Sequence, residues 1–266
     1  MDKIVDVEGG QLHARLEGAG DALVVLVHEL GGSLASWDDV VPYIAGKARV
    51  LRYDMRGFGL SSAAGPDLFI ELAVADLIAV IATAGPASRL ILVGNAVGAA
   101  VVVGYLLRNP LERCAAILIS PALGVMPERR VTVLEAADRL AIGGMACIID
   151  AELDRSYPSA LRLRSPRRFS DYRDIFARTD ARSFAAYLRM LADLHLADEL
   201  YRIAHPMLVL SGTLDPNRPP SEGRMLASRA ADARYEEVLS GHFMAYQTPD
   251  LFIAAATPFL DQHLLV

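Results

Sequence analysis

Two residues in the last third of the chain, Asp215 and His242, have side chains suited to proton transfer. Each follows a short apolar segment, which places it in a loop just beyond an expected strand. A carboxylate that accepts a hydrogen bond from an imidazole orients the ring and favours its charged form, so the histidine can act as a general base. Turn aspartates and single histidines are common, and the pair therefore needs a third position to indicate a reaction.

That third position is Ala96, at the centre of Gly94-Asn95-Ala96-Val97-Gly98. An apolar β-type run precedes this pentapeptide and an apolar helical run follows it. In the pattern Gly-x-Ser-x-Gly, such a turn holds a nucleophilic serine in a strained conformation, and the glycines allow strand and helix to approach closely. Alanine has no side-chain oxygen, so covalent catalysis through residue 96 is excluded.

The segments around these residues alternate between short apolar β-type runs and amphipathic helices. This alternation predicts a mostly parallel sheet with helices on both faces and an antiparallel hairpin at one edge. The expected strands cover residues 22–27, 48–53, 89–93, 115–119, 207–210 and 234–238, and the hairpin covers 4–7 and 12–16. The expected helices of this core cover 34–44, 70–83, 97–107 and 251–263.

One interval, residues 125–200, breaks the alternation because it contains helical patterns and no convincing strand. We expect it to form a helical lid over the carboxyl ends of the strands, where open α/β sheets bind ligands. The chain then divides into a core, residues 1–124 and 201–266, and this lid. Its expected helices cover 131–141, 145–153, 168–177 and 181–194. The lid is rich in arginine; most surface arginines are simply solvated, but one could bind a substrate carboxylate.

Three further motifs carry a resemblance to a known family. They are His28-Glu29-Leu30-Gly31-Gly32-Ser33 with Trp37, the D-x-R-G-x-G-x-S sequence Asp54-Met55-Arg56-Gly57-Phe58-Gly59-Leu60-Ser61, and Gly241-His242. Together with the turn at residues 94–98, which corresponds to the nucleophile elbow of the family, they resemble the α/β-hydrolase fold. Within that fold, the chain resembles the 3-oxoadipate enol-lactonase-like group over nearly its whole length. The order elbow, Asp215, His242 is the chain order of that fold's catalytic triad. The resemblance implies a hydrolase that acts on a small carbonyl compound such as a lactone or ester.

The same resemblance implies roles for individual residues. Ala96 occupies the nucleophile position, and the backbone N–H groups of Leu30 and Val97 form the oxyanion hole. We expect a substrate pocket that includes three further side chains. These are His28, which also braces its loop, Ser120 and His195.

Two departures from the family pattern fall in this site: Glu29 replaces the usual glycine after the loop histidine, and Ala96 replaces serine. An experimenter who replaced a serine to trap a substrate would normally change that residue alone. Two departures in one site therefore favour alanine as the native residue. The superfamily also contains a natural alanine in this elbow, as in the aminoacrylate hydrolases of pyrimidine degradation.

Three interpretations of Ala96 stay open. In the first, an experimenter replaced a serine and silenced a serine hydrolase. In the second, the alanine is native and His242 either activates water, with Glu29 exchanging a second proton, or removes a proton next to a carbonyl, which leads to elimination, decarboxylation or isomerisation. In the third, the protein is an inert ligand-binding relative. Other hydroxyl and thiol groups are weak candidates for a nucleophile because none lies on an elbow: Ser33, Ser61, Ser62, Ser120 and Cys114.

Composition limits the partners. The chain has 266 residues, of which 53% are hydrophobic, and a net charge of −6, which argues against nucleic acid or an anionic membrane as a partner. It lacks a signal-like N-terminus, an apolar run of about 18 residues, metal-ligand spacing and a dinucleotide-binding motif. We therefore expect a cytoplasmic monomer or homodimer that acts on a small molecule without a metal or other cofactor.

Overall fold

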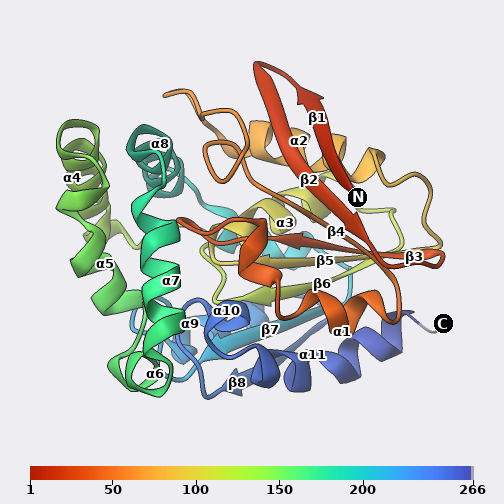
Figure 1. The fold of residues 1–266 in the computed structure, drawn as a ribbon. Coiled ribbons are helices and arrows are strands. Elements are labelled where there is room, and N and C mark those ends of the chain that lie inside the picture. The colour runs from red at the N-terminus through yellow and green to blue at the C-terminus, as the bar shows by residue number, and fades with distance from the viewer. Residues whose placement is uncertain (265–266) are drawn as a thin grey trace.

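The computed structural model describes residues 1–264, which surround an eight-stranded sheet with the order β1-β2-β4-β3-β5-β6-β7-β8 (Figure 1). The pairs β1–β2 and β2–β4 are antiparallel, and all other neighbouring strands are parallel. The strands are β1 (Asp2–Val7), β2 (Gly10–Glu17), β3 (Ala22–Val27), β4 (Arg49–Tyr53), β5 (Arg89–Asn95), β6 (Cys114–Ile119), β7 (Met207–Gly212) and β8 (Ala233–Val238). The predicted sheet, with its edge hairpin, is confirmed.

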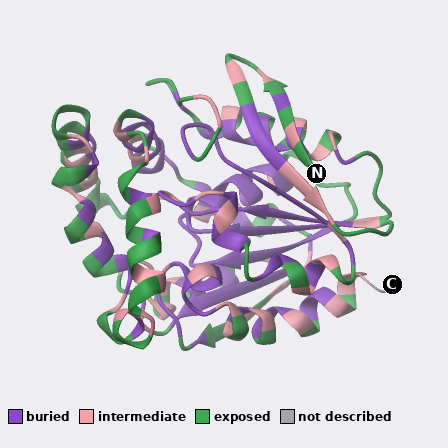
Figure 2. Cartoon of the chain, in the orientation of Figure 1, coloured by how far each residue is buried: buried purple, intermediate pink, exposed green. Residues whose placement is uncertain are grey.

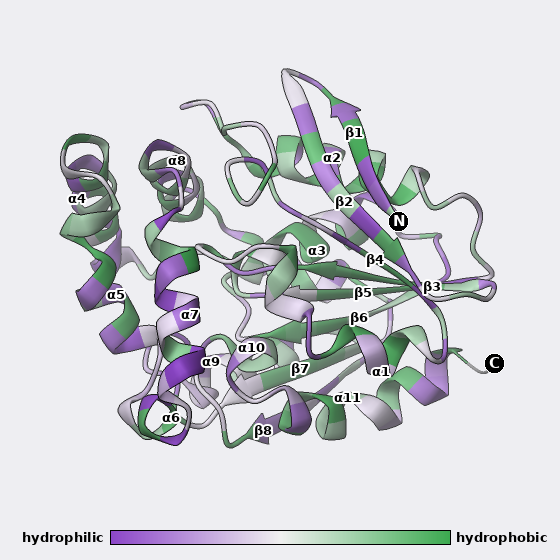
Figure 3. Cartoon of the chain, viewed as in Figure 1, coloured by the Kyte–Doolittle hydropathy of each residue, from purple (hydrophilic) through white to green (hydrophobic). Residues whose placement is uncertain are grey.

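Strands β3, β5, β6 and β7 each contain an apolar run that is buried on both faces, because helices cover both faces of the sheet. On β3, Val25 and Val27 belong to the core under α2 (Ile70–Ala82) and α3 (Val97–Arg108). Val24 and Leu26, which point the other way, belong to the core under α1 (Val41–Ala45) and α11 (Pro249–Leu264). Figures 2 and 3 show these strands as both buried and hydrophobic.

The core helices differ from the prediction in two places. Residues 34–44 form a 3-10 helix, Leu34–Trp37, followed by the short α1, because Pro42 has no N–H group to continue one helix through this segment. The helix α9 (Pro220–Arg229) was not predicted, because Pro219 and Pro220 resemble a break. Proline at the first helical position is nevertheless favourable, since that N–H group has no partner within the helix.

The interval between β6 and β7 is helical. It contains α4 (Pro127–Gly143), a 3-10 turn (Met145–Cys147), α5 (Ile149–Ser156), α6 (Ser159–Arg164), α7 (Pro166–Ala177), α8 (Ala181–Ala192) and the 3-10 helix Leu196–Arg202. A single antiparallel bridge between Gly124 and His195 joins the two ends of this insertion. Figure 1 shows its helices gathered beyond one end of the sheet. The domain boundaries at 125 and 200 stay predictions, and the last 3-10 helix runs across the second of them.

The short α10 (Met244–Gln247) lies between the loop that carries His242 and the last helix, α11. Among the helices of residues 1–264, none combines the length and apolar character that a membrane span requires.

Candidate active site

The turn at residues 94–98 forms a strand-to-helix elbow at the end of β5, with Ala96 at its centre. Ala96 has φ 50° and ψ −111°, a conformation in which a residue with a Cβ atom is strained. Its N–H group donates to Ile119 O (2.9 Å), and its carbonyl oxygen accepts from Ala122 N (3.1 Å). A Cβ atom on Gly98 would lie 2.3 Å from Val27 O, so this glycine allows α3 to pack against β3.

The loops after β7 and β8 bring Asp215 and His242 together. The distance between His242 Nδ1 and Asp215 Oδ2 is 2.7 Å, and Asp215 Oδ1 accepts from the N–H groups of Asn217 (2.9 Å) and Arg218 (3.1 Å). An ionised carboxylate only accepts hydrogen bonds, so Nδ1 carries the proton. This assignment leaves Nε2 as the basic nitrogen of the neutral ring.

The charges around this pair favour a proton on His242. Burial lowers the pKa of His242, but the Asp215 carboxylate raises it and the lid residue Glu152 raises it further, so that the net shift is upward. Burial would raise the pKa of Asp215, but His242, the Arg218 N–H group and the Ser120 hydroxyl lower it, and the net shift is downward. The pair therefore consists of an ionised acid and a strengthened base.

Two unpaired backbone donors lie beside Ala96. Leu30 and Val97 line the same cavity as Ala96 and His242. Across residues 1–264, neither of their N–H groups donates to another protein atom. Val97 is also the first residue of α3, where the helix dipole favours negative charge. The geometry suits an oxygen that becomes negative during a reaction.

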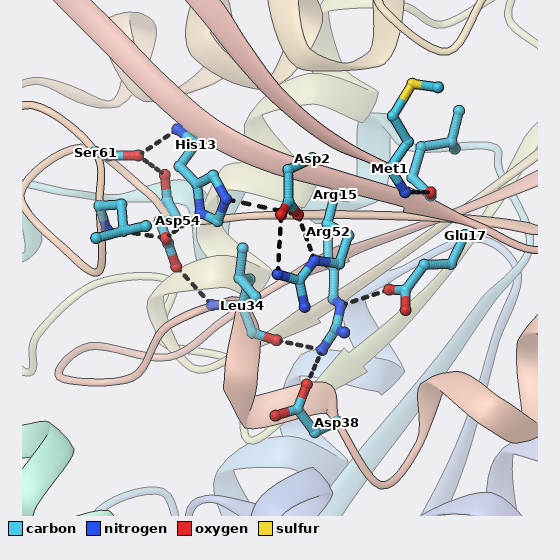
Figure 4. Close-up of polar contacts among 12 residues, drawn as sticks. Met1, Asp2, His13, Arg15, Glu17, Leu34, Asp38, Arg52, Asp54 and Ser61 are labelled. Atoms are coloured by element: carbon cyan, nitrogen blue, oxygen red, sulfur yellow. Dashed lines mark hydrogen bonds and ion pairs between the residues drawn. The ribbon is translucent and has the colours of Figure 1, made fainter.

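The D-x-R-G-x-G-x-S turn holds the segment that follows residues 28–33, which we call the oxyanion loop because it contains Leu30. Asp54 Oδ1 accepts from Leu34 N (2.8 Å), and Asp54 Oδ2 accepts from His13 Nδ1 (2.9 Å) (Figure 4). Arg52 donates to Leu34 O (2.9 Å), so the backbone of Leu34 is fixed through both its polar groups. This turn therefore has a structural role next to the site.

His28 braces the oxyanion loop from within the core. The N–H group of Met55 donates to His28 Nε2 (2.9 Å), so Nδ1 carries the proton and donates to Glu29 O (2.7 Å). Burial lowers the pKa of His28, which keeps the ring neutral. The side chain is fully buried and does not line the cavity described below, contrary to our expectation for the pocket.

The other two expected pocket residues also lie outside the cavity lining. His195 is exposed at the base of the insertion. Ser120 is fully buried after β6, with φ 44°, and its Oγ has no hydrogen bond of good geometry within the described chain. Its hydroxyl is close enough to Asp215 to lower the pKa of that carboxyl. Ser120 therefore adjoins the acid rather than the substrate space.

A cavity of about 320 Å³ lies between the elbow and the insertion, within the usual range for small-molecule sites. Val133, Leu188 and Phe243 contribute apolar walls. Its charged lining consists of Arg129, Arg139, Arg155, Arg218, Glu152 and Glu222. Arg129, Arg139 and Arg155 of this lining belong to the arginine-rich insertion. Sequence reasoning missed Glu152 and Arg218, because the faces of α5 and of the Asp215 loop that line the cavity are set by tertiary packing.

The Glu29 carboxylate points away from this space. Only 1% of the residue is exposed, it is absent from the cavity lining, and its partners are Ser36, Asn95 and Tyr172. The expected placement of Glu29 as a proton-transfer group in the cavity therefore does not match the structure. Within residues 1–264, no group of three His, Cys, Asp or Glu side chains is arranged to hold a metal ion.

The parallel sheet, the elbow, the Asp–His pair and the two free N–H groups together define an α/β-hydrolase. Residues 18–241 match the serine aminopeptidase S33 family, and the chain belongs to this family. It is 25% identical to pyrrolizixenacetamide deacetylase of Xenorhabdus hominickii, over 96% of this chain and 97% of the relative. It is 22% identical to 3-oxoadipate enol-lactonase 2 of Acinetobacter baylyi, over 86% and 85%.

The chain is also similar to a solved structure. The crystal structure of the enol-lactonase from Burkholderia xenovorans is 31% identical, superimposes with a TM-score of 0.89, and covers 97% of this chain and 99% of its own. The relatives are hydrolases by name, and the expectation of a hydrolase-type enzyme related to the enol-lactonases is confirmed.

Proposed function

We propose that this protein hydrolyses a small lactone, ester or related carbonyl compound without a covalent intermediate, using His242 as general base. The observation that carries this proposal is the shared lining of one cavity: His242, the methyl group of Ala96, and the Leu30 and Val97 residues with their free N–H groups. A serine at position 96 would place an oxygen here. With alanine, the same space can hold a water molecule.

In the proposed reaction, His242 Nε2 removes a proton from this water, and the water oxygen forms a bond to the carbonyl carbon. The carbonyl oxygen becomes an oxyanion and accepts hydrogen bonds from Leu30 and Val97. When the intermediate collapses, the bond to the leaving oxygen breaks, and the imidazolium returns its proton to that oxygen. The products are a carboxylic acid and an alcohol or enol, and Asp215 stabilises the imidazolium throughout.

The magnitudes are sufficient for catalysis without serine. One oxyanion donor that meets developing charge contributes roughly 2.7–4 kcal/mol, and a positioned general base adds about 10²–10⁴-fold in rate. Neither contribution requires a hydroxyl at residue 96. The loss of the nucleophile therefore removes one reaction route and leaves the other groups in place.

The charged cavity lining supports a substrate with a carboxylate. Arg155 is paired with Glu152, and Arg218 with Glu222. Arg129 and Arg139, on one face of α4, make no ion pair among the described residues. The cavity therefore has two more arginines than glutamates, and an anionic substrate would be attracted to the α4 side.

The test is turnover in H₂¹⁸O with lactones and esters that carry a free carboxylate, beginning with 3-oxoadipate enol-lactone, the compound in the name of the Acinetobacter baylyi relative. We expect one ¹⁸O atom in the product carboxylate, no covalent adduct on the protein by mass spectrometry, and a loss of at least about 100-fold in kcat for His242→Ala. Turnover that survives His242→Ala would contradict the proposal. A product without ¹⁸O would instead support removal of a proton next to the carbonyl.

A further inference from the structure

The buried carboxylate of Glu29 contacts three separate parts of the molecule. Its Oε1 atom accepts from the Ser36 hydroxyl (2.8 Å), in the 3-10 helix after the oxyanion loop, and from the Tyr172 hydroxyl (2.8 Å), in α7 of the insertion. Its Oε2 atom accepts from Asn95 Nδ2 (3.3 Å), in the residue directly before Ala96. One side chain thus links the loop, the elbow and the insertion.

The hydrogen-bond partners of Glu29 indicate that its carboxylate holds these three segments together. A buried carboxylate is costly unless hydrogen bonds satisfy its oxygens, and all three donors here are neutral groups. Burial raises the pKa of Tyr172, and the Glu29 carboxylate raises it further, so the phenol stays protonated and donates. Because a carboxylate only accepts, the Asn95 amide must present its nitrogen to Glu29.

The neighbouring glycines leave room for this arrangement. A Cβ atom on Gly32 would lie 2.3 Å from Glu29 Oε1, so any other residue would displace the carboxylate. Gly31 has φ 84°, and a Cβ atom there would lie 2.3 Å from the Phe176 ring of α7. The oxyanion loop therefore packs directly against α7, the helix that carries Tyr172.

The backbone of Glu29 explains why this anchor matters for the oxyanion hole. Glu29 O accepts from His28 Nδ1 (2.7 Å) and from Gly32 N (3.1 Å). In a planar trans peptide, the C=O and N–H groups point in opposite directions. Because the carbonyl of the Glu29–Leu30 peptide is held toward His28, the Leu30 N–H group points away from it, on the side of the cavity.

We infer that Glu29 is a positioning residue that couples the oxyanion loop to α7 through Tyr172, so that the Leu30 N–H group is held in place only while α7 is seated on the loop. The catalytic consequence rests on the function proposed above; the mechanical coupling does not. Glu29 acts through the peptide that it anchors and takes no part in proton transfer.

Amide hydrogen exchange tests the coupling without any substrate. In Glu29→Gln, the acceptor of the Ser36 and Tyr172 hydrogen bonds loses its negative charge, and in Tyr172→Phe the donor is lost. Loss of the charge, or of a hydrogen bond to it, predicts roughly 10- to 100-fold faster exchange of the Gly32 amide in both variants. The control is Tyr157→Phe, a second buried tyrosine of the insertion, whose ring packs against Tyr172. Its Gly32 exchange should equal that of the unmodified protein.

A rescue variant separates anchoring from proton transfer. In Glu29→Gln/Asn95→Asp, the glutamine amide can donate to the new carboxylate, which restores a charged hydrogen bond between the oxyanion loop and the elbow. We expect the exchange rate of the Gly32 amide to return to within about threefold of its rate in the unmodified protein. A tenfold difference in rate would correspond to about 1.4 kcal/mol. With substrate, kcat should fall in Glu29→Gln with little change in KM and recover in the double variant.

The outcomes are distinct. Unchanged Gly32 exchange in both Glu29→Gln and Tyr172→Phe would overturn the coupling, and if Glu29→Gln does not fold, Tyr172→Phe decides alone. Faster exchange with unchanged kcat would overturn the link to the oxyanion hole. A kcat that the double variant does not rescue, although protection returns, would indicate proton transfer by Glu29 and contradict the positioning role. If the protein does not carry out the hydrolysis proposed above, the exchange measurement still tests the coupling between the oxyanion loop and α7, because it needs no substrate.

Discussion

His242 Nδ1 lies 2.7 Å from Asp215 Oδ2, and the same imidazole lines the cavity next to the methyl group of Ala96. The acid and base of a triad are therefore assembled around a position that has no nucleophile. A hydrogen-bonded pair of this kind fixes the tautomer of the ring and leaves its second nitrogen for chemistry. Asp215 thus orients the imidazole and raises the pKa of His242, while residue 96 offers no side-chain group for this base to activate.

The pH dependence of kcat/KM should report this base. Because the pKa of His242 is raised, the basic form is populated only above that pKa, so activity should fall as the pH decreases, with a midpoint above the ordinary histidine value. Glu152→Gln should move the midpoint downward, because the Glu152 carboxylate raises the pKa. Asp171→Asn, on the exposed outer part of α7, should leave it unchanged. A midpoint that does not respond to Glu152→Gln would contradict the assignment.

Asp215→Asn should lower kcat by at least about 100-fold, because an asparagine can present its amide to Nδ1 and favour the wrong tautomer. The midpoint of any remaining activity should move to lower pH, since burial then acts on His242 without its anion. Steady-state kinetics across pH gives both quantities. A variant with unchanged kcat would exclude His242 as the base.

Ala96→Ser tests whether the rest of the triad can support covalent catalysis. The serine hydroxyl would occupy the strained elbow beside His242, with the Leu30 and Val97 N–H groups unchanged. We expect hydrolysis of activated aryl esters with a burst, and an acyl adduct on residue 96 by mass spectrometry. The double variant Ala96→Ser/His242→Ala should lack both. If only Ala96→Ser is active on every lactone and ester, including carboxylate-bearing ones, the protein is a silenced serine hydrolase.

The sequence predicted the sheet and the elbow well because their signals are local. Each central strand is a short run that is apolar on both faces, and Gly94 and Gly98 mark the close approach of strand and helix. The broken helix at residues 34–44 and the undetected α9 depend on how single prolines act at helix starts. Such effects are decided by the neighbouring backbone geometry, which the apolar pattern does not contain.

The candidate site was predictable only where a motif fixes the backbone. Asp215 and His242 follow strands that end at the same edge of the sheet, so their meeting could be foreseen. The side chains of Glu29 and His28 turn into the core instead, and His195 lies at the surface. These directions result from tertiary contacts, such as the hydrogen bonds of Met55 to His28 and of Tyr172 to Glu29, which the sequence pattern does not contain.

The substrate carboxylate can be tested on α4. Arg129→Gln and Arg139→Gln should each raise KM for an anionic substrate about 1.4- to fivefold, since an exposed ion pair contributes roughly 0.2–1 kcal/mol. KM for the corresponding neutral methyl ester should not change. Arg167→Gln is the matched control, because its side chain is 96% exposed and does not line the cavity. Equal effects on both substrates would contradict a carboxylate on this side.

The elbow itself gives a prediction about stability. Gly98→Ala would bring a Cβ atom 2.3 Å from Val27 O, a backbone atom of β3 that cannot move away as a flexible side chain would. Helix α3 must then shift away from the sheet. Overpacking of this kind costs about 1–3 kcal/mol in the free energy of unfolding, which urea denaturation would measure.

The control for this prediction is Gly65→Ala, where no atom lies within 4 Å of the added Cβ and the free energy of unfolding should change little. Because α3 begins at Val97, the same shift would move the Val97 N–H group relative to Leu30. Gly98→Ala should therefore lose activity at temperatures at which it is still folded. A variant that is destabilised but keeps its full kcat would mean that the Val97 donor is not required.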